Sequence, residues 1–267
     1  MAVLNVFKMY TSISGEGNTA GEPCIILRLA GCDRRCRWCD TKEAQNVVAG
    51  RMFSTKDVAD VINRMRQGLL LVTGGEPLLQ AEAVADLMER IPSKRLEVET
   101  SQTTASPYTS CIPDCINDQY PDICMDVKTP SSGEVSDVID LDFDRIDSLK
   151  FVIADVDDWL FAKEWIRTRA PEEFFAGIYV SPEWSVRKKV LEWLVGEVIT
   201  SGLPVKLSLQ LHKVLSLPED QFPDLLKLAG IRPLLAEEVA SANSAELEAP
   251  AANPAVNPAN IEDGEDR

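Results

Sequence analysis

The sequence predicts an α/β fold built on a mostly parallel β-sheet, and two observations lead to this prediction. Short apolar segments with strand character alternate with amphipathic helical segments along most of the chain, and this alternation is typical of parallel sheets. Glycine-containing and polar motifs recur just after the strand-like segments. Because ligands collect at the carboxyl ends of parallel strands, we expect these loops to meet in one pocket. The sheet is expected to be open or curved into a barrel.

The expected strands are short apolar runs, several of which are bounded by glycine, proline or polar residues. In chain order they span residues 3–10, 24–30, 69–73, 95–100, 123–128, 148–154, 177–180 and 205–210.

The expected helices lie between these strands. Ser54 to Asp57 has the sequence of a capping box, a motif whose side chains satisfy the free backbone N–H groups of a first helical turn. Apolar residues then recur at helical spacing (Val58, Val61, Ile62 and Met65). Further helices are expected over residues 81–91, 155–169 and 185–200.

Length and composition predict one domain followed by a tail. The chain has 267 residues, of which 45% are hydrophobic, and this is enough for a single catalytic domain with a large core, expected over residues 1–235. Residues 236–267 are rich in alanine, asparagine, proline and glutamate, and they contain eight acidic residues and one basic residue. This acidic tail is expected to be disordered.

Charge and hydrophobicity exclude several classes of partner. A net charge of −16 argues against nucleic-acid binding, which needs a basic surface. No apolar run approaches the roughly 18 residues of a membrane span, and the amino terminus lacks the pattern of a signal peptide. A cytoplasmic protein without membrane contact is therefore expected, with its seven cysteines reduced rather than paired in disulfides.

Three cysteines close together indicate a metal-cluster site. Cys32, Cys36 and Cys39 fall within eight residues, directly after an apolar strand, and no fourth cysteine follows at a comparable interval. Structural zinc sites and common iron–sulfur sites use four ligands, so three ligands favour a 4Fe–4S cluster with one open iron. The alternative is a zinc loop completed by His212 or by Cys111, Cys115 or Cys124.

A second motif follows the next strand, where Gly74 and Gly75 precede Glu76 and Pro77. The two glycines can expose main-chain groups, and the two residues after them can fix the turn, which suits the binding of an amino-acid ammonium group. Alone, this motif could be any turn from a strand to a helix.

Together, the two motifs resemble the radical S-adenosylmethionine superfamily. Within it, the order of motifs between about residue 5 and about residue 215 is similar to that of the 7-carboxy-7-deazaguanine synthase family. The motifs are residues 13–17, 28–32, 39–41, 73–80, 99–100, 126–133, 150–152 and 210–213.

This resemblance implies a fold and a reaction. The fold would be an incomplete TIM-like β/α barrel, a modified form of the radical S-adenosylmethionine core. The reaction would convert 6-carboxy-5,6,7,8-tetrahydropterin to 7-carboxy-7-deazaguanine with loss of ammonia, on the route to 7-deazapurine nucleosides such as queuosine and archaeosine. The enzyme would be a carbon–nitrogen lyase that uses a 4Fe–4S cluster, S-adenosylmethionine and Mg²⁺. An electron donor such as flavodoxin or ferredoxin would be a partner, and a homodimer is implied.

The resemblance also implies roles for individual residues. Cys32, Cys36 and Cys39 would bind the cluster and Thr41 would bind Mg²⁺, which prefers oxygen ligands. Arg28 would hold the substrate carboxylate, since a guanidinium can bind both oxygens. The other substrate-binding residues would be Ile13, Ser14, Gly15, Glu16, Thr100 and His212. S-adenosylmethionine would be bound by Gly74, Gly75, Glu76, Gln102, Asp126, Val127 and Lys128. No catalytic residue is expected beyond the groups that bind cofactors.

The sequence departs from the family pattern at two of these positions. Ser14 stands where a glutamine is usual, so that any contact with the pterin there must use the backbone or water. Gln102 stands where glycine is common, which puts the contact with S-adenosylmethionine at that position in question. Cys111, Cys115 and Cys124 are additional, and they leave open a second cluster or zinc site or simply buried thiols.

Two other functions remain open at the level of sequence. One is a glycyl-radical enzyme activase of the same superfamily, which would share the cysteine spacing but not the motifs at 126–133 and 210–213. The other is a noncatalytic iron–sulfur protein, which would have a fully ligated cluster and no affinity for S-adenosylmethionine.

Overall fold

A computed structural model describes residues 2–101, 121–134, 146–169, 177–217 and 221–247. Side chains of residues 243–247 are not described. Gln102, Cys111, Cys115 and residues 248–267 of the expected tail lie outside the described residues.

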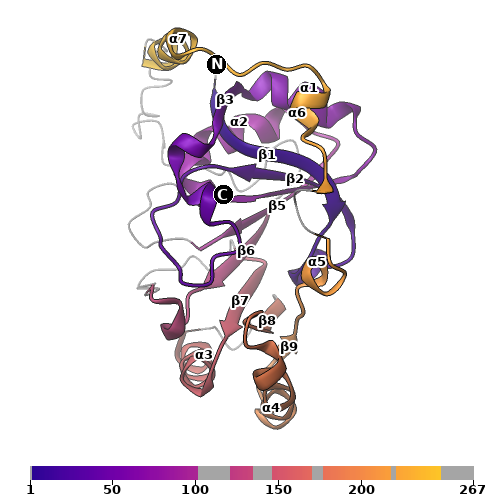
Figure 1. The fold of residues 1–267 in the computed structure, drawn as a ribbon, viewed down its shortest axis with the longest axis vertical. Helices are drawn as coiled ribbons and strands as arrows, with labels where there is room; N and C mark the ends of the chain where they lie inside the picture. Colours follow the sequence, from indigo (N-terminus) through magenta and orange to yellow (C-terminus); the bar gives the residue numbers. More distant parts are fainter. Residues whose placement is uncertain (1, 102–120, 135–145, 170–176, 218–220, 248–267) are drawn as a thin grey trace, which may run out of the picture.

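One nine-stranded sheet organises the fold (Figure 1). Its order is β3-β1-β2-β4-β5-β6-β7-β8-β9, so the sheet is not closed. All pairs from β2 onward are parallel, whereas β1 runs antiparallel to both β2 and β3. The structure therefore confirms the mostly parallel sheet of an incomplete β/α barrel. The strands are β1 (Val3–Ile13), β2 (Pro23–Leu29), β3 (Arg51–Ser54), β4 (Leu69–Gly74), β5 (Arg95–Thr100), β6 (Asp122–Val127), β7 (Ser148–Ile153), β8 (Gly177–Pro182) and β9 (Val205–Leu207).

The four main helices lie in the expected segments and connect parallel strands. They are α1 (Thr55–Arg64), α2 (Ala81–Arg90), α3 (Val156–Arg169) and α4 (Arg187–Thr200). Ser54 caps the start of α1 as expected, because its hydroxyl accepts a hydrogen bond from the backbone N–H of Asp57 at 3.1 Å and donates to the Asp57 carboxylate at 2.6 Å. Shorter elements are α5 (Leu211–Val214), α6 (Leu225–Leu228) and the 3₁₀ turns η1 (Gly17–Thr19), η2 (Lys42–Gln45), η3 (Val47–Ala49), η4 (Pro77–Gln80) and η6 (Pro130–Ser132).

The main apolar core lies on one face of the sheet. One cluster packs α1 and α2 against β1 to β5, and another packs α3 and α4 against β6 to β8. Successive residues of a strand point to opposite faces. Thus Leu149, Phe151 and Ile153 of β7 enter the core, whereas Lys150 points to the other face. That second face carries a small apolar cluster on β1, β2 and β4 and is otherwise left for polar side chains; the cluster is Tyr10, Cys24, Ile26, Leu69 and Leu71.

Besides the short helices α5 and α6 and the 3₁₀ turns, strand β3 and helix α7 were not expected from the sequence. Strand β3 has only four residues, too few to show a pattern, and it is defined by antiparallel pairing with the start of β1. Helix α7 (Ala236–Leu247) occupies the first twelve residues of the stretch expected to be a disordered tail. Alanine and glutamate favour helices, and Glu238 in its first turn pairs with Arg232 at 2.6 Å and accepts from the N–H of Leu235 at 2.7 Å. Local pairing thus orders this part of the tail.

Among the described residues, no helix is long and apolar enough to cross a membrane.

Glu97 of β5 is a buried carboxyl group whose protonation should affect stability. Its side chain is 2% exposed, and burial, with the nearby Glu99 and Asp122 carboxylates, raises its pKa to about 8, although Arg95 and Thr19 act in the opposite direction. The ordinary value lies near 4.5. Between these two values the folded protein keeps a proton that the unfolded chain loses, so stability should fall as pH rises from 5 to 8.

We therefore expect Glu97→Gln to remove a pH dependence of up to ~1.4 kcal/mol per pH unit in the free energy of unfolding. Urea unfolding of the parent and the variant at pH 5, 6.5 and 8 measures it. The free energy of unfolding of the variant should increase relative to that of the parent at each increase in pH. A difference that stays constant with pH would contradict the buried, protonated state of Glu97.

Candidate active site

A cavity of about 710 Å³ opens on the polar face of the sheet, at the carboxyl ends of the strands. Fifteen residues expected in the site line it: Ile13, Gly15, Glu16, Arg28, Cys32, Cys36, Cys39, Thr41, Gly74, Gly75, Glu76, Thr100, Asp126, Lys128 and His212. These residues come from the end of β1 and the loop after it, from β2, from β4 to β6 and the turns that follow them, and from α5. The others come from the loop that carries Cys32, Cys36 and Cys39, here called the cysteine loop. The structure thus brings together motifs that are separated by up to two hundred residues.

Of the expected residues that the structure describes, two do not line this cavity. Ser14 is fully buried, and its hydroxyl contacts the Thr19 hydroxyl at 2.7 Å and the Glu16 carbonyl at 3.3 Å. Val127 is fully buried in the apolar core. Gln102 lies outside the described residues. The short side chain of Ser14 therefore stabilises the turn rather than reaching into the cavity.

The cysteine loop is held by backbone contacts on both sides. The N–H of Arg37 donates to the Ser132 carbonyl at 2.9 Å, and the N–H of Arg35 donates to the Glu134 carboxylate at 2.6 Å. At the start of the loop, the N–H of Gly31 donates to the Ala44 carbonyl at 2.8 Å. The segment after β6, which includes η6, thus fixes one side of the loop, and η2 fixes the other.

The turn after β4 packs directly on the start of the cysteine loop. A Cβ atom on Gly75 would lie 1.9 Å from the Gly31 carbonyl oxygen, and Gly74 has a φ of +139° that side chains rarely tolerate. The N–H of Glu76 donates to the same Gly31 oxygen at 2.8 Å. The glycines are therefore needed for close packing of two backbones, in addition to lining the cavity.

The carboxylate of Glu76 joins this turn to the end of β5. One oxygen accepts hydrogen bonds from the N–H of Leu78 at 3.0 Å and the Thr100 hydroxyl at 2.6 Å. The other accepts from the N–H of Ser101 at 2.9 Å and its hydroxyl at 3.1 Å. Since both oxygens are engaged, Glu76 fixes the shape of this wall, as expected of a residue that sets the turn.

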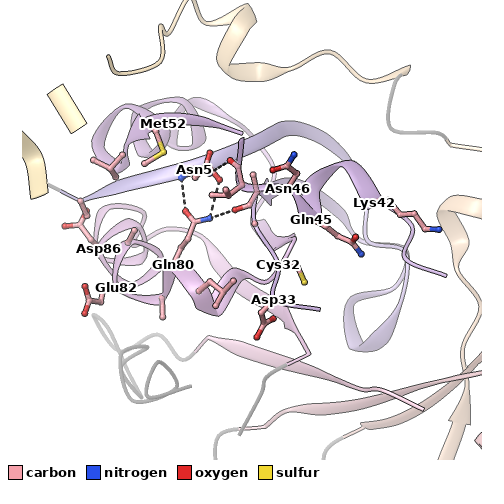
Figure 2. A pocket seen from close by; sticks show the side chains of 18 of the residues that line it. Asn5, Cys32, Asp33, Lys42, Gln45, Asn46, Met52, Gln80, Glu82 and Asp86 are labelled. Carbon is pink, nitrogen blue, oxygen red and sulfur yellow. Dashed lines mark hydrogen bonds between the residues drawn. The ribbon is translucent and has the colours of Figure 1, made fainter. Parts of the chain in front are cut away.

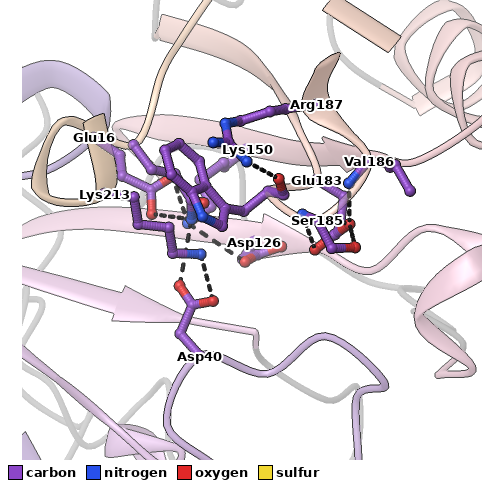
Figure 3. A network of polar contacts seen from close by, with 11 residues as sticks. Glu16, Asp40, Asp126, Lys150, Glu183, Ser185, Val186, Arg187 and Lys213 are labelled. Atoms are coloured by element: carbon purple, nitrogen blue, oxygen red, sulfur yellow. Dashed lines mark hydrogen bonds and ion pairs between the residues drawn. The ribbon is translucent and has the colours of Figure 1, made fainter. Parts of the chain in front are cut away.

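A network of charged groups crosses the cavity (Figure 3). Lys150 Nζ lies 3.2 Å from Glu16 Oε2 and 3.5 Å from Asp126 Oδ2, and Lys128 Nζ lies 3.0 Å from the same Asp126 oxygen. The Gln210 amide connects this group to the cysteine loop, because its Nε2 donates to Glu16 Oε1 at 3.2 Å and to Asp40 Oδ2 at 3.4 Å. Asp40 Oδ1 in turn is 2.5 Å from Lys213 Nζ. Ion pairs and one amide thus link the loop after β1, the strands β6 and β7, the cysteine loop and α5.

His212 packs against the first loop of the chain. A Cβ atom on Gly15 would lie 2.2 Å from its Nδ1, and the N–H of Leu211 donates to the Gly15 carbonyl at 2.9 Å. Burial lowers the pKa of His212, although the carboxylates of Glu16 and Asp40 oppose this. A neutral imidazole at the cavity wall follows.

Comparison with known proteins identifies the family. A model of the 4Fe-4S single cluster domain matches residues 13–132. A 7-carboxy-7-deazaguanine synthase of Methanospirillum hungatei is 34% identical to this chain over 218 residues, covering 80% of this chain and 86% of the relative. One from Koribacter versatilis is 30% identical, covering 81% of this chain and 98% of the relative. The chain belongs to the 7-carboxy-7-deazaguanine synthase family.

A solved structure supports the fold of this family member. The crystal structure of QueE from Escherichia coli matches with a TM-score of 0.60 and 21% identity, covering 79% of this chain and 95% of that chain. Family membership confirms the expected resemblance and makes the chain an enzyme with a 4Fe–4S cluster and S-adenosylmethionine as cofactors. A glycyl-radical activase and a noncatalytic iron–sulfur protein are not favoured.

The three cysteines of this family member fit a cluster better than a single ion. In the described part of the chain, no three His, Cys, Asp or Glu side chains surround one point where a metal ion could bind. Ligands of a 4Fe–4S cluster instead bind different iron atoms, and Cys32, Cys36 and Cys39 all line the same cavity. Burial raises the pKa of Cys32 to about 11 and also raises that of Cys36. Metal binding needs thiolates, so cluster assembly must release these protons.

Several cavity residues had no role assigned from the sequence. Lys150 and Glu99 are charged residues within strands whose alternate positions are apolar, and this alternation was a usable signal. Asp40 and Lys213 lie in quoted motifs, but only the fold shows that they pair. Trp184, whose ring lies 3.5 Å from the guanidinium carbon of Arg187, carried no signal in the sequence.

A second and larger hollow, of about 1250 Å³, lies beside the site (Figure 2). Cys32 lines both hollows. In the wall of the larger hollow, the Gln80 side chain accepts from the N–H of Asn5 at 2.7 Å and donates to the carbonyls of Asn5 at 3.3 Å and Ala30 at 3.1 Å. Gln80 therefore anchors η4 to β1 and to the end of β2.

Substitution of Gly75 by alanine tests the close packing beneath the cysteine loop. The added methyl group would overlap the Gly31 carbonyl, so the loop must shift away from the turn. We expect reconstituted Gly75→Ala to bind at most half as much iron and sulfide as the parent and to absorb less near 400 nm.

The matched control is Gly196→Ala, because a Cβ atom there would meet nothing within 4 Å. This control should bind the cluster as the parent does. Full cluster content in Gly75→Ala would show that the turn does not constrain the loop.

Proposed function

We propose that this chain converts 6-carboxy-5,6,7,8-tetrahydropterin to 7-carboxy-7-deazaguanine with release of ammonia. The observation that carries the proposal is that one cavity joins the three cysteines to Arg28, Glu16 and His212, in a chain of this family. A site for a buried cluster thus lies beside polar groups that suit a small, planar and anionic substrate. The product would feed the synthesis of 7-deazapurine nucleosides such as queuosine or archaeosine.

Cys32, Cys36 and Cys39 would hold the cluster through three irons. Asp126, Lys128, Gly74 and Gly75 line the cavity and would bind S-adenosylmethionine there. When bound, the two cofactors supply a radical that abstracts hydrogen from the substrate, while the protein positions the substrate and excludes competing reactions. Glu76 would act by shaping this wall, since both its oxygens are already hydrogen-bonded. Gln102 and Val127 stay proposed only as neighbours of this subsite.

The substrate would lie between β2 and α5. Arg28 would bind its carboxylate and Glu16 would accept hydrogen bonds from its guanidine-like edge. Ile13 and Gly15 would contact the ring, with Thr100 and His212 at its border. Because the Ser14 side chain is turned away from the cavity, only its backbone would contribute.

Mg²⁺ would bind at Thr41. This residue lines the cavity two positions after the last cluster cysteine, and although it stands at the amino end of η2, its side chain makes no capping hydrogen bond. The hydroxyl thus has no helix-capping role there, and oxygen ligands suit a hard cation, with water and substrate filling the other positions.

The remaining parts of the proposal concern partners and location. A flavodoxin or ferredoxin would deliver the electron to the cluster, and the enzyme would act as a cytoplasmic homodimer. Residues 1–235 would form the catalytic domain, with 236–267 as an acidic appendage to it.

The proposed reaction is tested with anaerobically reconstituted protein. Incubation with dithionite, S-adenosylmethionine, Mg²⁺ and the carboxytetrahydropterin should yield 7-carboxy-7-deazaguanine, identified by mass spectrometry. The Cys36→Ala protein should form none, because one of the three cluster ligands is lost. Absence of product from parent protein with a spectroscopically intact cluster would refute the proposed reaction.

Substitution at Thr41 tests the proposed Mg²⁺ site. Thr41→Val keeps the size of the side chain but removes the oxygen, so activity at saturating Mg²⁺ should fall at least tenfold. Thr41→Ser keeps the hydroxyl and should retain a Mg²⁺-dependent rate within about threefold of the parent. Initial rates from 0 to 10 mM Mg²⁺ measure this, and an unchanged Mg²⁺ dependence in Thr41→Val would rule out the site.

A further inference from the structure

Lys150 is the central cation of the network in the cavity. It lies in β7 with 7% of its surface exposed, and its ammonium group is placed between Glu16 Oε2 at 3.2 Å and Asp126 Oδ2 at 3.5 Å (Figure 3). These two carboxylates come from the loop after β1 and from β6. A single side chain therefore forms ion pairs with two segments that are distant along the chain.

The charge on Lys150 is maintained by its surroundings. Burial alone would favour the neutral amine, but the carboxylates of Glu16, Asp126 and Glu99 together raise the pKa of Lys150 well above its ordinary value. Desolvating such a group is costly, and a buried ion pair is weak evidence for stability. The adjacent positions of β7 are filled by core side chains, so packing does not require a cation there.

The two carboxylates face different proposed subsites. Glu16 belongs to the wall proposed to bind the pterin, and Asp126 to the wall proposed to bind S-adenosylmethionine. Asp126 Oδ1 is buried and accepts no hydrogen bond within the described part of the chain. A buried acceptor of this kind is costly unless a ligand donates to it. The other oxygen of Asp126, Oδ2, pairs with Lys150 and Lys128. These two contacts orient the carboxylate and thereby fix the position of Oδ1.

We propose that Lys150 is a positioning residue that couples the pterin site to the S-adenosylmethionine site by fixing Glu16 and Asp126 together. This inference rests on the proposed function. A ligand that binds to one carboxylate helps to order the shared ammonium group. Less ordering free energy is then lost when the second ligand binds to the other carboxylate, so the second ligand binds more tightly. Such coupling is reciprocal, and each ligand must change the affinity of the other by the same factor.

The coupling is measured with the oxidised, cluster-loaded enzyme, which binds ligands without turnover. Calorimetric titration gives the Kd of S-adenosylmethionine with and without saturating carboxytetrahydropterin, and the Kd of the pterin with and without saturating S-adenosylmethionine. In the parent we expect each ligand to tighten the other at least fivefold. Independent binding in the parent would overturn the inference.

Lys150→Met removes the charge but keeps an unbranched apolar chain of similar length. We expect both Kd values to rise at least tenfold and the coupling factor to fall to about one. The matched control is Lys94→Met, since Lys94 is also buried but donates to the backbone carbonyls of Met65 at 2.7 Å and Gln67 at 2.8 Å. This control removes a buried lysine outside the cavity, and it should keep both affinities and the coupling factor of the parent.

Lys150→Arg provides a second variant in case Lys150→Met does not fold. It keeps the positive charge but replaces a compact ammonium with a wider planar group, so the coupling factor should fall at least threefold while the cluster content stays that of the parent. Parent-like coupling in a folded Lys150→Met, or in Lys150→Arg, would overturn the inference. Failure of the parent to bind the pterin or to form product would instead overturn the proposed function.

Discussion

The contact between the turn after β4 and the start of the cysteine loop is the constraint on which the site depends. The Gly31 carbonyl accepts the N–H of Glu76 and leaves no room for a side chain at Gly75. Glu76 in turn binds the end of β5 through Thr100 and Ser101. Hydrogen bonds of the protein thereby join the carboxyl ends of β2, β4 and β5. A loop that must carry a large inorganic cluster is thus supported by rigid backbone, as precise positioning requires.

The second constraint is electrostatic. Buried carboxylates and ammonium groups lie side by side in the cavity, and each is tolerated because its neighbours carry the opposite charge. Burial raises the pKa of Glu99 and lowers that of His212, and the nearest opposite charges act against both shifts. In a chain with net charge −16, the cavity lining places cations such as Arg28, Lys128 and Lys150 among carboxylates. The local balance, rather than the total charge, therefore determines what the cavity can accept.

The division of the sheet into two faces explains how these two constraints coexist. Helices α1 to α4 pack on one face with apolar side chains, and the alternation of strand residues places the charged side chains on the other face, beside a small apolar cluster. Stability and ligand binding are thus assigned to opposite sides of the same strands. In β7, Phe151 packs in the core while the preceding Lys150 joins the charged network.

The sequence by itself determined most of the strands and helices, the cap at Ser54, the three cysteines and the series of short motifs that indicates the family. These features are local, because each depends on residues that are neighbours along the chain. It did not reveal β3, whose four residues form a strand only by pairing with β1, or the helix at the start of the tail.

Only the tertiary structure decided which polar residues meet. It turned Ser14 away from the cavity, paired Asp40 with Lys213, and placed Lys150 between Glu16 and Asp126. These partners are separated by up to 173 positions, and no local pattern encodes such contacts. They arise because parallel strands bring their carboxyl ends to one edge, where a side chain is positioned by neighbours from other strands.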